Sequence, residues 1–447
     1  MRVFILFIIT ILMGINTAFA YEIVLPKEKK TIVNTKYAFF IGKAKNSEII
    51  EINDQKVYIA QNGAFAHSIK LKDGENRIVI RSNFNTQVYK IYRNPAIQNT
   101  KPELLEFTPQ IYTVIKDNSP LRSSPVDGGM NRLSHLFEET SLLIDGEKGD
   151  FYRVFLSKNN YAWISKKHVK KSNKKIEPNF ITTNTETYKN ASVYSIEFTE
   201  KIPYTIEEND KELIFKTYNP FVSEESVYTL NIKKPEKYYY KINLNKGQYA
   251  LKINEFPTPE QNLEGITITI DPGHGGTEKG AIGCLGDEEK KINLQIAEQL
   301  KTLLENLGAN VVMTRECDAY ISLDDRVKIA QDNYSDLFIS IHLNSIPDIE
   351  MNVHKNKGTS VFYYNPNSKM LAKTLENSIT QALNTKKAGT HSASFAVLRP
   401  TDYIGVLVEV AYMTNPLDSV LYTKEDFPSE TAKAITDGIL NFLNNEN

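Results

Sequence analysis

The stretch ITITIDPGHGG, residues 266–276, decides the fold of the C-terminal part of this 447-residue chain. It begins with a continuous run of β-branched residues, which is typical of a buried strand in a parallel sheet. An Asp, a Pro, a His and three glycines follow this run within six positions. Glycines at a strand end let the backbone turn sharply. They also suit a phosphate cradle or a space cleared around a metal ion, and the rest of the chain has to decide between these roles.

Strand-like and helical patterns alternate from this stretch to the C-terminus. From Ile292 onward, apolar residues recur at the spacing of one helix face, and Gly308 ends this helix. Further strands are expected at residues 310–315, 336–344, 359–364 and 405–413, and further helices at 323–334, 368–383 and 429–443. Such alternation predicts an α/β domain with a largely parallel sheet.

Three candidate metal ligands fall at the carboxyl ends of the predicted strands. His274 follows the strand at 266–270, His342 lies in the last part of the strand at 336–344, and Glu289 begins the next helix. Ligands of an open α/β sheet bind at this edge. Two His and one Glu form a known zinc-binding set that leaves a fourth position for water. Each residue alone also has a structural explanation, because an acid in a first helical turn is favoured by the helix dipole.

The phosphate-binding alternative requires motifs that this sequence lacks. A P-loop needs Gly-Lys-Ser or Gly-Lys-Thr after the glycines, and a dinucleotide-binding fingerprint needs a glycine where Glu278 stands. The HExxH motif of zincins is absent as well. The sequence therefore favours a metal site of another kind.

A further carboxylate, Glu409, lies inside the otherwise apolar stretch GVLVEVAYM. A buried and unpaired carboxylate is energetically expensive. Glu409 therefore needs either an ion-pair partner, for which Arg399 is the candidate, or a catalytic role. We favour the catalytic role, because a carboxylate beside a zinc site can take a proton from water and pass it on.

The first twenty residues have the pattern of a secretory signal peptide. Arg2 precedes an apolar run, and Ala18-Phe19-Ala20 forms a small-x-small cleavage site. The alternative is an uncleaved anchor, but the run is shorter than the ~20 apolar residues that a spanning helix needs. We therefore expect cleavage after Ala20, no transmembrane segment in the mature protein, and export to the periplasm or the extracellular cell wall.

Cysteine content and charge narrow the class further. Two cysteines, Cys284 and Cys317, do not make a disulfide framework, so two thiols are the favoured state and a single disulfide is the alternative. The formal net charge is −1, which provides no basic field for nucleic acid. We expect a monomer that binds no nucleic acid.

Residues 21–257 have the pattern of β structure throughout. Alternating runs and turn signals predict a β-sandwich at 21–97, which resembles bacterial immunoglobulin-like modules. Short strands and a late Trp163 at 110–171 resemble a bacterial SH3-like barrel, either a wall-binding module or a spacer. A second sandwich is expected at 178–257, with a weaker resemblance to wall-targeting modules.

Six motifs of the C-terminal part resemble, in order and context, zinc-dependent N-acetylmuramoyl-L-alanine amidases of the Amidase_3 type. The resemblance covers residues 264–446 and rests on IDPGHGG, EKKINL, TRECDAYISLDDRVKIA, FISIHLNS, FAVLRPT and VLVEVAYMTNP. It implies that His274, Glu289 and His342 bind one zinc ion and that Glu409 is catalytic. It also implies the substrate, which is the amide bond between N-acetylmuramoyl and L-alanine in peptidoglycan.

The resemblance leads to a functional hypothesis with two alternatives. We expect a zinc amidase that acts in cell-wall remodelling or daughter-cell separation. The alternatives are a zinc hydrolase that cuts another peptidoglycan bond and a non-catalytic wall-binding protein. Asp271 is expected either to orient His274 or to cap the turn at the strand end, and Asn344 and Arg399 either to contact substrate or to support the site.

Overall fold

The computed structural model of the chain describes residues 21–45, 48–83, 85–95, 102–173, 175–189, 191–209, 211–245, 248–256, 262–345 and 355–444. The predicted signal peptide, residues 1–20, lies outside the described residues, so its cleavage stays a prediction. Among the described residues, no helix is both long enough and apolar enough to cross a membrane.

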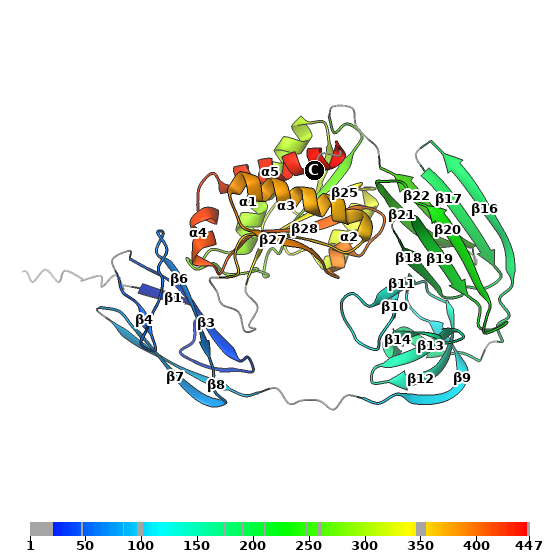
Figure 1. Cartoon of the computed structure of the whole chain (residues 1–447), viewed down its shortest axis with the longest axis horizontal. Helices are drawn as coiled ribbons and strands as arrows, with labels where there is room; N and C mark the ends of the chain where they lie inside the picture. The colour runs from blue at the N-terminus through cyan, green and yellow to red at the C-terminus, as the bar shows by residue number, and fades with distance from the viewer. Residues whose placement is uncertain are drawn as a thin grey trace, which may run out of the picture.

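Three β modules surround a central α/β domain (Figure 1). We call them the N-terminal module (residues 21–95), the second module (102–173), the third module (175–256) and the α/β domain (262–444). In Figure 1 the N-terminal module lies on one side of the α/β domain, and the second and third modules lie on the other. The predicted fold class is confirmed, whereas the immunoglobulin-like and SH3-like identities stay predictions.

The N-terminal module contains two sheets. One has the strand order β1-β3-β6 and the other the order β2-β8-β7-β4-β5. Strands β2 and β8 pair in parallel, while the other pairs are antiparallel. The strands are β1 (Tyr21–Leu25), β2 (Lys30–Val33), β3 (Tyr37–Ala44), β4 (Glu51–Ile52), β5 (Gln55–Lys56), β6 (Ala64–Lys70), β7 (Gly74–Arg81) and β8 (Thr86–Arg93).

The second module is built on one seven-stranded antiparallel sheet with the order β11-β10-β14-β13-β12-β9-β15. Its elements are β9 (Leu105–Val114), β10 (Ser119–Arg122), β11 (Arg132–Leu136), β12 (Ser141–Lys148), β13 (Phe151–Ser157), β14 (Asn160–Ser165), the short helix η1 (Lys166–His168) and β15 (Val169–Lys171).

The third module has a four-stranded sheet, β16-β17-β22-β21, and a three-stranded sheet, β18-β19-β20. Its strands are β16 (Phe180–Tyr188), β17 (Ala191–Phe198), β18 (Tyr204–Glu208), β19 (Glu212–Tyr218), β20 (Val227–Lys233), β21 (Tyr238–Asn245) and β22 (Gln248–Glu255).

The second and third modules share one hydrophobic core. Ile144 of the second module belongs to the same buried cluster as Phe215 and Tyr204 of the third. Hydrogen bonds join the two modules across β11 and β18: Ser134 Oγ donates to the carbonyl of Tyr204 at 2.5 Å, and Tyr204 Oη donates to the carbonyl of His135 at 2.7 Å. The two modules therefore form one body.

The α/β domain contains a six-stranded sheet with the order β24-β23-β25-β28-β26-β27. Strand β26 runs antiparallel to β28, while the remaining neighbours are parallel, so the sheet is largely parallel as predicted. Its elements are β23 (Thr267–Pro272), α1 (Glu289–Asn306), β24 (Asn310–Met313), α2 (Leu323–Asp332), β25 (Leu337–Asn344), β26 (Thr359–Tyr363), η2 (Pro366–Ser368), α3 (Lys369–Leu383), β27 (Lys387–Ser392), η3 (Ala396–Leu398), β28 (Ile404–Tyr412), α4 (Pro416–Tyr422) and α5 (Phe427–Leu443).

Strand alternation separates the two faces of this sheet. Ile339 and Val408 point into a large core that they share with α1, α3 and α5. Phe338 and Leu407 point to the other face, where they pack with α2 and η3. Because successive side chains of a strand point to opposite faces, polar residues spaced by two from Phe338 and Leu407 lie on the α2 face.

The third module is also anchored in the α/β domain. Phe256, which is 3% exposed, belongs to the core of that domain and meets Phe442 edge to face at 6.0 Å between ring centroids. Tyr239 Oη donates to Asp336 Oδ1 at 2.9 Å, and the backbone N–H of Tyr240 donates to the carbonyl of Thr401 at 2.7 Å. Burial of Phe256 indicates that the third module stabilises the α/β domain.

The N-terminal module packs on the α/β domain next to the glycine-rich loop. Ile41 and Ala64 share an apolar cluster with the buried Cys284, and Tyr412 packs against this cluster from the end of β28. Tyr412 lies three residues after Glu409, so the contact lies close to the candidate site.

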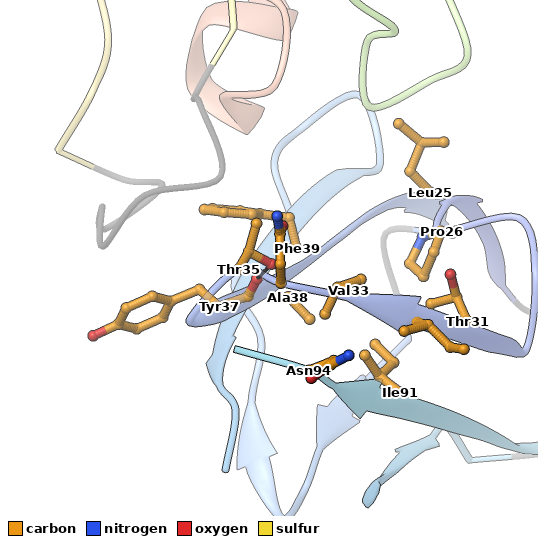
Figure 2. A pocket seen from close by; sticks show the side chains of 12 residues that line it. Leu25, Pro26, Thr31, Val33, Thr35, Tyr37, Ala38, Phe39, Ile91 and Asn94 are labelled. Atoms are coloured by element: carbon orange, nitrogen blue, oxygen red, sulfur yellow. Dashed lines mark hydrogen bonds between the residues drawn. The ribbon is translucent and has the colours of Figure 1, made fainter. Parts of the chain in front are cut away.

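A groove of about 630 Å³ crosses the N-terminal module (Figure 2). Leu25, Pro26, Tyr37, Phe39 and Ile91 are among its lining residues. All lining residues belong to the N-terminal module, so the groove is separate from the three candidate metal ligands.

Candidate metal centre

The three predicted metal ligands lie together at the carboxyl edge of the sheet. Each offers one ligand atom, and the atoms of His274, Glu289 and His342 lie within 4.8 Å of one another. Glu289 Oε2 lies 3.2 Å from His274 Nε2, and Glu289 Oε1 lies 2.9 Å from His342 Nδ1. The two rings are nearly perpendicular, at 80°. Two imidazoles and a carboxylate are a donor set that suits a metal ion such as zinc.

Two glycines clear the space that this group occupies. A Cβ at Gly273 would overlap the ring of His342, and a Cβ at Gly280 would overlap Glu289 and His274. By contrast, Cβ atoms at Gly275 and Gly276 would collide with the loop that carries Ala319 and Tyr320. Gly273 therefore makes room for the ring of His342, while Gly275 and Gly276 allow the loops to pack. The role of these glycines in clearing space around a metal stays a prediction.

The carboxylate of Glu289 is buried but fully partnered. It accepts hydrogen bonds from the backbone N–H of Ala281 at 2.7 Å, from Leu343 N at 3.2 Å and from Asn293 Nδ2 at 3.2 Å. Burial raises the pKa of this carboxyl, but the hydrogen bonds and charges of His274 and His342 outweigh burial and hold the pKa below its ordinary value. Glu289 is therefore ionised, as a metal ligand must be.

Glu409 lies beside the metal ligands on the neighbouring strand. Its register partner on β25 is His342. Both side chains are on the α2 face, since Glu409 follows Leu407 by two positions and His342 follows Phe338 by four. One carboxylate oxygen, Oε2, is buried and has no hydrogen-bond partner among the described residues. Burial and the negative charge of Glu289 raise the pKa of Glu409 well above its ordinary value.

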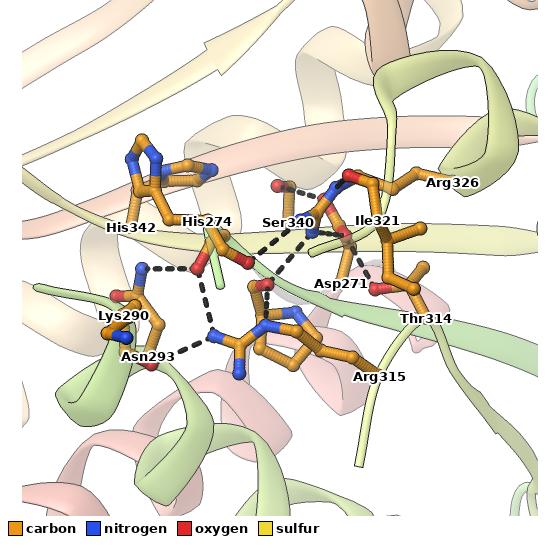
Figure 3. Close-up of polar contacts among 12 residues, drawn as sticks. Asp271, His274, Lys290, Asn293, Thr314, Arg315, Ile321, Arg326, Ser340 and His342 are labelled. Atoms are coloured by element: carbon orange, nitrogen blue, oxygen red, sulfur yellow. Dashed lines mark hydrogen bonds and ion pairs between the residues drawn. The ribbon is translucent and has the colours of Figure 1, made fainter. Parts of the chain in front are cut away.

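Two arginines hold the backbone that presents His274 (Figure 3). Arg315 donates from Nε to the carbonyl of Pro272 and from Nη2 to the carbonyl of Gly273, both at 2.9 Å. Arg326 donates from Nη2 to the carbonyl of His274 at 2.8 Å. His274 has a φ of 60°, an unusual value for a residue other than glycine. The arginines therefore hold a backbone conformation that the chain would otherwise rarely adopt.

Asp271 reaches His274 only indirectly. Its carboxylate accepts from Thr314 Oγ1 at 2.7 Å, from Ser340 Oγ at 2.7 Å and from Arg326 Nη1 at 2.6 Å. Burial raises the pKa of Asp271, but Arg326 and the two hydroxyls outweigh it, so the pKa lies below its ordinary value. Asp271 therefore bonds Arg326, which in turn bonds the His274 backbone. Its predicted role, to orient His274 or to cap the turn at the strand end, stays a prediction.

Arg399 and Asn344 are the two residues that were predicted either to contact substrate or to support the site. Arg399 precedes the amino end of β28, at the opposite edge of the sheet from the carboxyl end that carries Glu409. Its guanidinium bonds Ser394, from Nε to Oγ at 3.0 Å and from Nη2 to the carbonyl at 2.8 Å. The ion pair of Arg399 with Glu409 is therefore not formed. Asn344 ends β25, where its carbonyl accepts from Met413 N at 2.7 Å.

Sequence reasoning missed several residues that support the site. Arg315, Arg326, Lys290 and Asn293 were not singled out, although all four lie in the quoted motifs. Lys290 Nζ bonds the carbonyl of Gly276 at 2.8 Å and Asp318 at 2.6 Å, and so links two loops of the site. Their position in motifs was the only available signal, because charged residues usually occupy solvated surfaces.

Both cysteines are free thiols in the structure, as the favoured interpretation expected. Cys284 is buried and Cys317 is exposed. Burial raises the pKa of the Cys284 thiol to about 12, with a further contribution from the charge of Asp287, so this thiol is unreactive.

The fold and the site together are typical of a hydrolase with a group suited to a metal ion: three donors lie at the carboxyl edge of an α/β sheet, and a buried carboxylate lies beside them. Comparison with known proteins agrees. The profile of the N-acetylmuramoyl-L-alanine amidase family (Amidase_3) matches residues 268–441. The uncharacterized protein YqiI of Bacillus subtilis is 35% identical over 194 residues, which are 42% of this chain and 91% of YqiI.

Two further proteins are similar over the same region. The probable cell wall amidase LytH of Staphylococcus saprophyticus is 37% identical over 180 residues, which cover 40% of this chain and 58% of LytH. The solved structure of the N-acetylmuramoyl-L-alanine amidase AmiC2 of Nostoc punctiforme is 36% identical over 40% of this chain and 97% of its own, with a TM-score of 0.38. The chain belongs to the N-acetylmuramoyl-L-alanine amidase family of the Amidase_3 type.

Proposed function

We propose that the mature protein is a zinc-dependent N-acetylmuramoyl-L-alanine amidase that acts on peptidoglycan outside the cytoplasm. The observation that carries the proposal is the buried, unpartnered Oε2 of Glu409 next to the His-Glu-His group. A carboxylate oxygen left without a partner at this position costs folding free energy. Within this family the cost has a functional reason, since the oxygen is available to a reacting water molecule.

In this proposal His274, Glu289 and His342 hold one zinc ion. Bound there, zinc supplies a Lewis acid that polarises the scissile carbonyl and lowers the pKa of water. Glu289 contributes the negative charge of the donor set. Asp271 and Arg326 hold the backbone of His274, so that its ring stays in place through the reaction.

Glu409 moves the proton in this reaction. Hydrolysis adds one water molecule across the amide C–N bond, so the lactyl group of muramic acid gains a hydroxyl and the L-alanine nitrogen gains a proton. Glu409 accepts a proton from the attacking water and delivers it to the departing nitrogen. A raised pKa suits the first of these two steps, because it makes Glu409 a stronger base toward the attacking water molecule.

The β modules are proposed to bring the enzyme to the wall. The N-terminal module contacts the α/β domain beside the glycine-rich loop, and the third module is anchored in the α/β core. Both contacts keep the modules close to the site. Binding of a module to the wall would therefore raise the local concentration of substrate at the metal centre.

The test uses the mature chain, residues 21–447, purified as a monomer. We expect about one zinc ion per chain by elemental analysis. After digestion of peptidoglycan, mass spectrometry should find new L-alanine amino termini and muramic acid with a free lactyl carboxylate. Cleavage inside the stem peptide or at a cross-link would instead identify a hydrolase of another peptidoglycan bond. Binding to the wall with zinc present and no cleavage would identify a wall-binding protein.

A further inference from the structure

Three arginines meet where the second module, the third module and the α/β domain join. Arg122 lies on β10 and Arg132 on β11, while Arg399 follows η3 of the α/β domain. The junction is closed by the hydrogen bond from Tyr240 N to the carbonyl of Thr401, two residues after Arg399. Met130, two residues before Arg132, is contacted from the α/β side by Ser392, with 3.8 Å between Oγ and Sδ.

The three positive charges act on one another. Burial, together with the charges of Arg399 and Arg122, lowers the pKa of the Arg132 guanidinium to about 10. The same surroundings act on His135, whose pKa burial and the charges of Arg132, Arg399 and Arg122 lower to about 4. Like charges that act on one another in this way destabilise the junction, and one carboxylate, Asp127, opposes the three positive charges.

The chain supplies fewer negative charges than positive ones to this cluster: the charge of Asp127 acts on all three arginines, and that of Asp324 acts on Arg399. Asp127 pairs with Arg122 at 2.6 Å, and Arg122 also bonds Asn131 and the carbonyl of Gly128. Arg399 bonds only neutral groups of Ser394. Within the part of the chain that the structure describes, neither Arg132 nor Arg399 forms a salt bridge with a carboxylate.

Arg132 carries an unused donor. Its Nε is buried and has no hydrogen-bond partner among the described residues, and its Nη1 only approaches His135 Nε2 at 3.4 Å. A buried N–H donor without a partner is costly, and the planar guanidinium that carries it matches the two oxygens of a carboxylate or phosphate. The geometry therefore suits an anion-binding site, because the guanidinium has a free donor and forms no salt bridge among the described residues.

We infer that Arg132 and Arg399, supported by Arg122, bind an oxyanion group at this junction, the carboxylate or phosphate of a polymeric ligand. The anion bridges the second module and the α/β domain and so fixes their relative position. The site lies at the opposite edge of the sheet from the metal ligands and takes no part in hydrolysis. Binding itself does not depend on the proposed amidase activity; only the identity of the polymer as cell wall rests on that proposal.

The first experiment measures thermal unfolding of the mature full-length protein in sodium phosphate against sodium chloride at equal ionic strength. We expect phosphate to raise the unfolding temperature by about 2–4 °C, because a ligand that binds only the folded state stabilises it. Arg132→Gln should remove this rise. In chloride its unfolding temperature should equal or exceed that of the wild type, because the substitution removes a repulsive charge.

Two further variants make the result decisive. Arg77→Gln removes an exposed arginine of the N-terminal module and should keep the full response to phosphate. Arg399→Gln approaches the same site from the α/β domain and should lose the response, which also covers the case that Arg132→Gln folds poorly. A wild type without a phosphate-specific rise, or the same rise in both site variants, would overturn the inference.

A second experiment separates the two sources of the anion. Co-sedimentation compares whole sacculi with sacculi whose phosphate-containing polymers have been removed by acid. Weaker binding after removal, with the loss reproduced by Arg132→Gln on whole sacculi, assigns the site to polymer phosphate. Unchanged binding that Arg132→Gln still weakens assigns it to stem-peptide carboxylates. Binding that Arg132→Gln leaves unchanged on both materials would refute a wall polymer as the ligand.

Discussion

Two regions of the molecule contain buried charges with different partners. The metal edge is the carboxyl edge of the sheet with the three candidate ligands, and the junction is the place where Arg132 and Arg399 lie between the modules and the α/β domain. At the metal edge, Asp271 pairs with Arg326, and Glu289 lies between two histidines, so the negative charges are matched by the chain itself. At the junction, the charges of Arg132 and Arg399 act on each other, and neither guanidinium forms a salt bridge among the described residues, although the charge of Asp127 acts on both. The first region is organised by its own folding, whereas the second region needs a ligand to be neutralised.

At the edge of the sheet that carries the metal ligands, one buried atom is not matched by a partner. Glu409 Oε2 is buried without a partner although every neighbouring charge is matched. The comparison therefore identifies two buried polar atoms without a hydrogen-bond partner among the described residues. One belongs to a carboxylate beside the metal ligands, and the other belongs to a guanidinium at the junction of the modules. Substitutions in each region should have different consequences, and the predictions below start with the largest.

Glu409→Gln should abolish most turnover while leaving the fold and zinc content unchanged. The substitution is nearly isosteric and removes only the base, so we expect a loss of about 10²-fold or more. The measurement is initial rate on purified peptidoglycan together with zinc analysis of the variant. His274→Ala serves as the contrast, because it should lose the metal as well as the activity. A Glu409→Gln enzyme at wild-type rate would refute the assignment of the base.

Asp271→Asn should destabilise the α/β domain more than any single substitution at the junction. It leaves Arg326 buried without its charge partner, which costs about 3–5 kcal/mol in comparable buried pairs. Ser340→Ala removes only a hydroxyl hydrogen bond to the same carboxylate and should cost about 1 kcal/mol. Chemical denaturation measures both. Equal effects of the two substitutions would mean that the ion pair contributes nothing beyond a neutral hydrogen bond.

The same pair should make stability depend on acid pH. The pKa of Asp271 is depressed in the folded state, so its contribution is complete above the unfolded pKa of about 3.9 and is lost as pH falls through the folded pKa. Denaturation curves of the wild type between pH 7 and pH 3 should show this loss. In Asp271→Asn the loss of unfolding free energy below pH 4 should be smaller than in the wild type. An equal loss in both proteins would contradict a depressed pKa of Asp271 as its cause.

The junction should make stability depend on pH in a higher range than Asp271 does. The folded pKa of His135 is about 4 against an ordinary value near 6.5, so the unfolded state binds the extra proton first. Stability should therefore decline as pH falls from about 6.5 toward 4 and stay level above that range. NMR titration of His135 in Arg132→Gln should show a higher pKa than in the wild type, because one positive charge has gone. An unchanged value would show that burial alone depresses it.

Most of the metal site was accessible from the sequence because its ligands follow directly from strand ends. His274, His342 and Glu289 each stand at the end or the start of a regular element, and parallel strands bring such positions to one edge. The continuous apolar stretch around Glu409 predicted that this carboxylate lies inside the sheet, in the strand that is now β28. Strand β27 was not predicted, because its sequence KAGTHS lacks the alternation of apolar and polar residues that is typical of a strand.

What the sequence determined by itself was local: the order of strands and helices, the export pattern, and the donors that a strand end presents. Only the tertiary structure decided which distant groups meet. Asp271 bonds Arg326 across 55 positions of the chain, and Arg132 meets Arg399 because separate modules share cores and an interface. The reason is physical, since periodicity and turn chemistry act over a few neighbouring residues, whereas packing and Coulomb forces depend on distance in space.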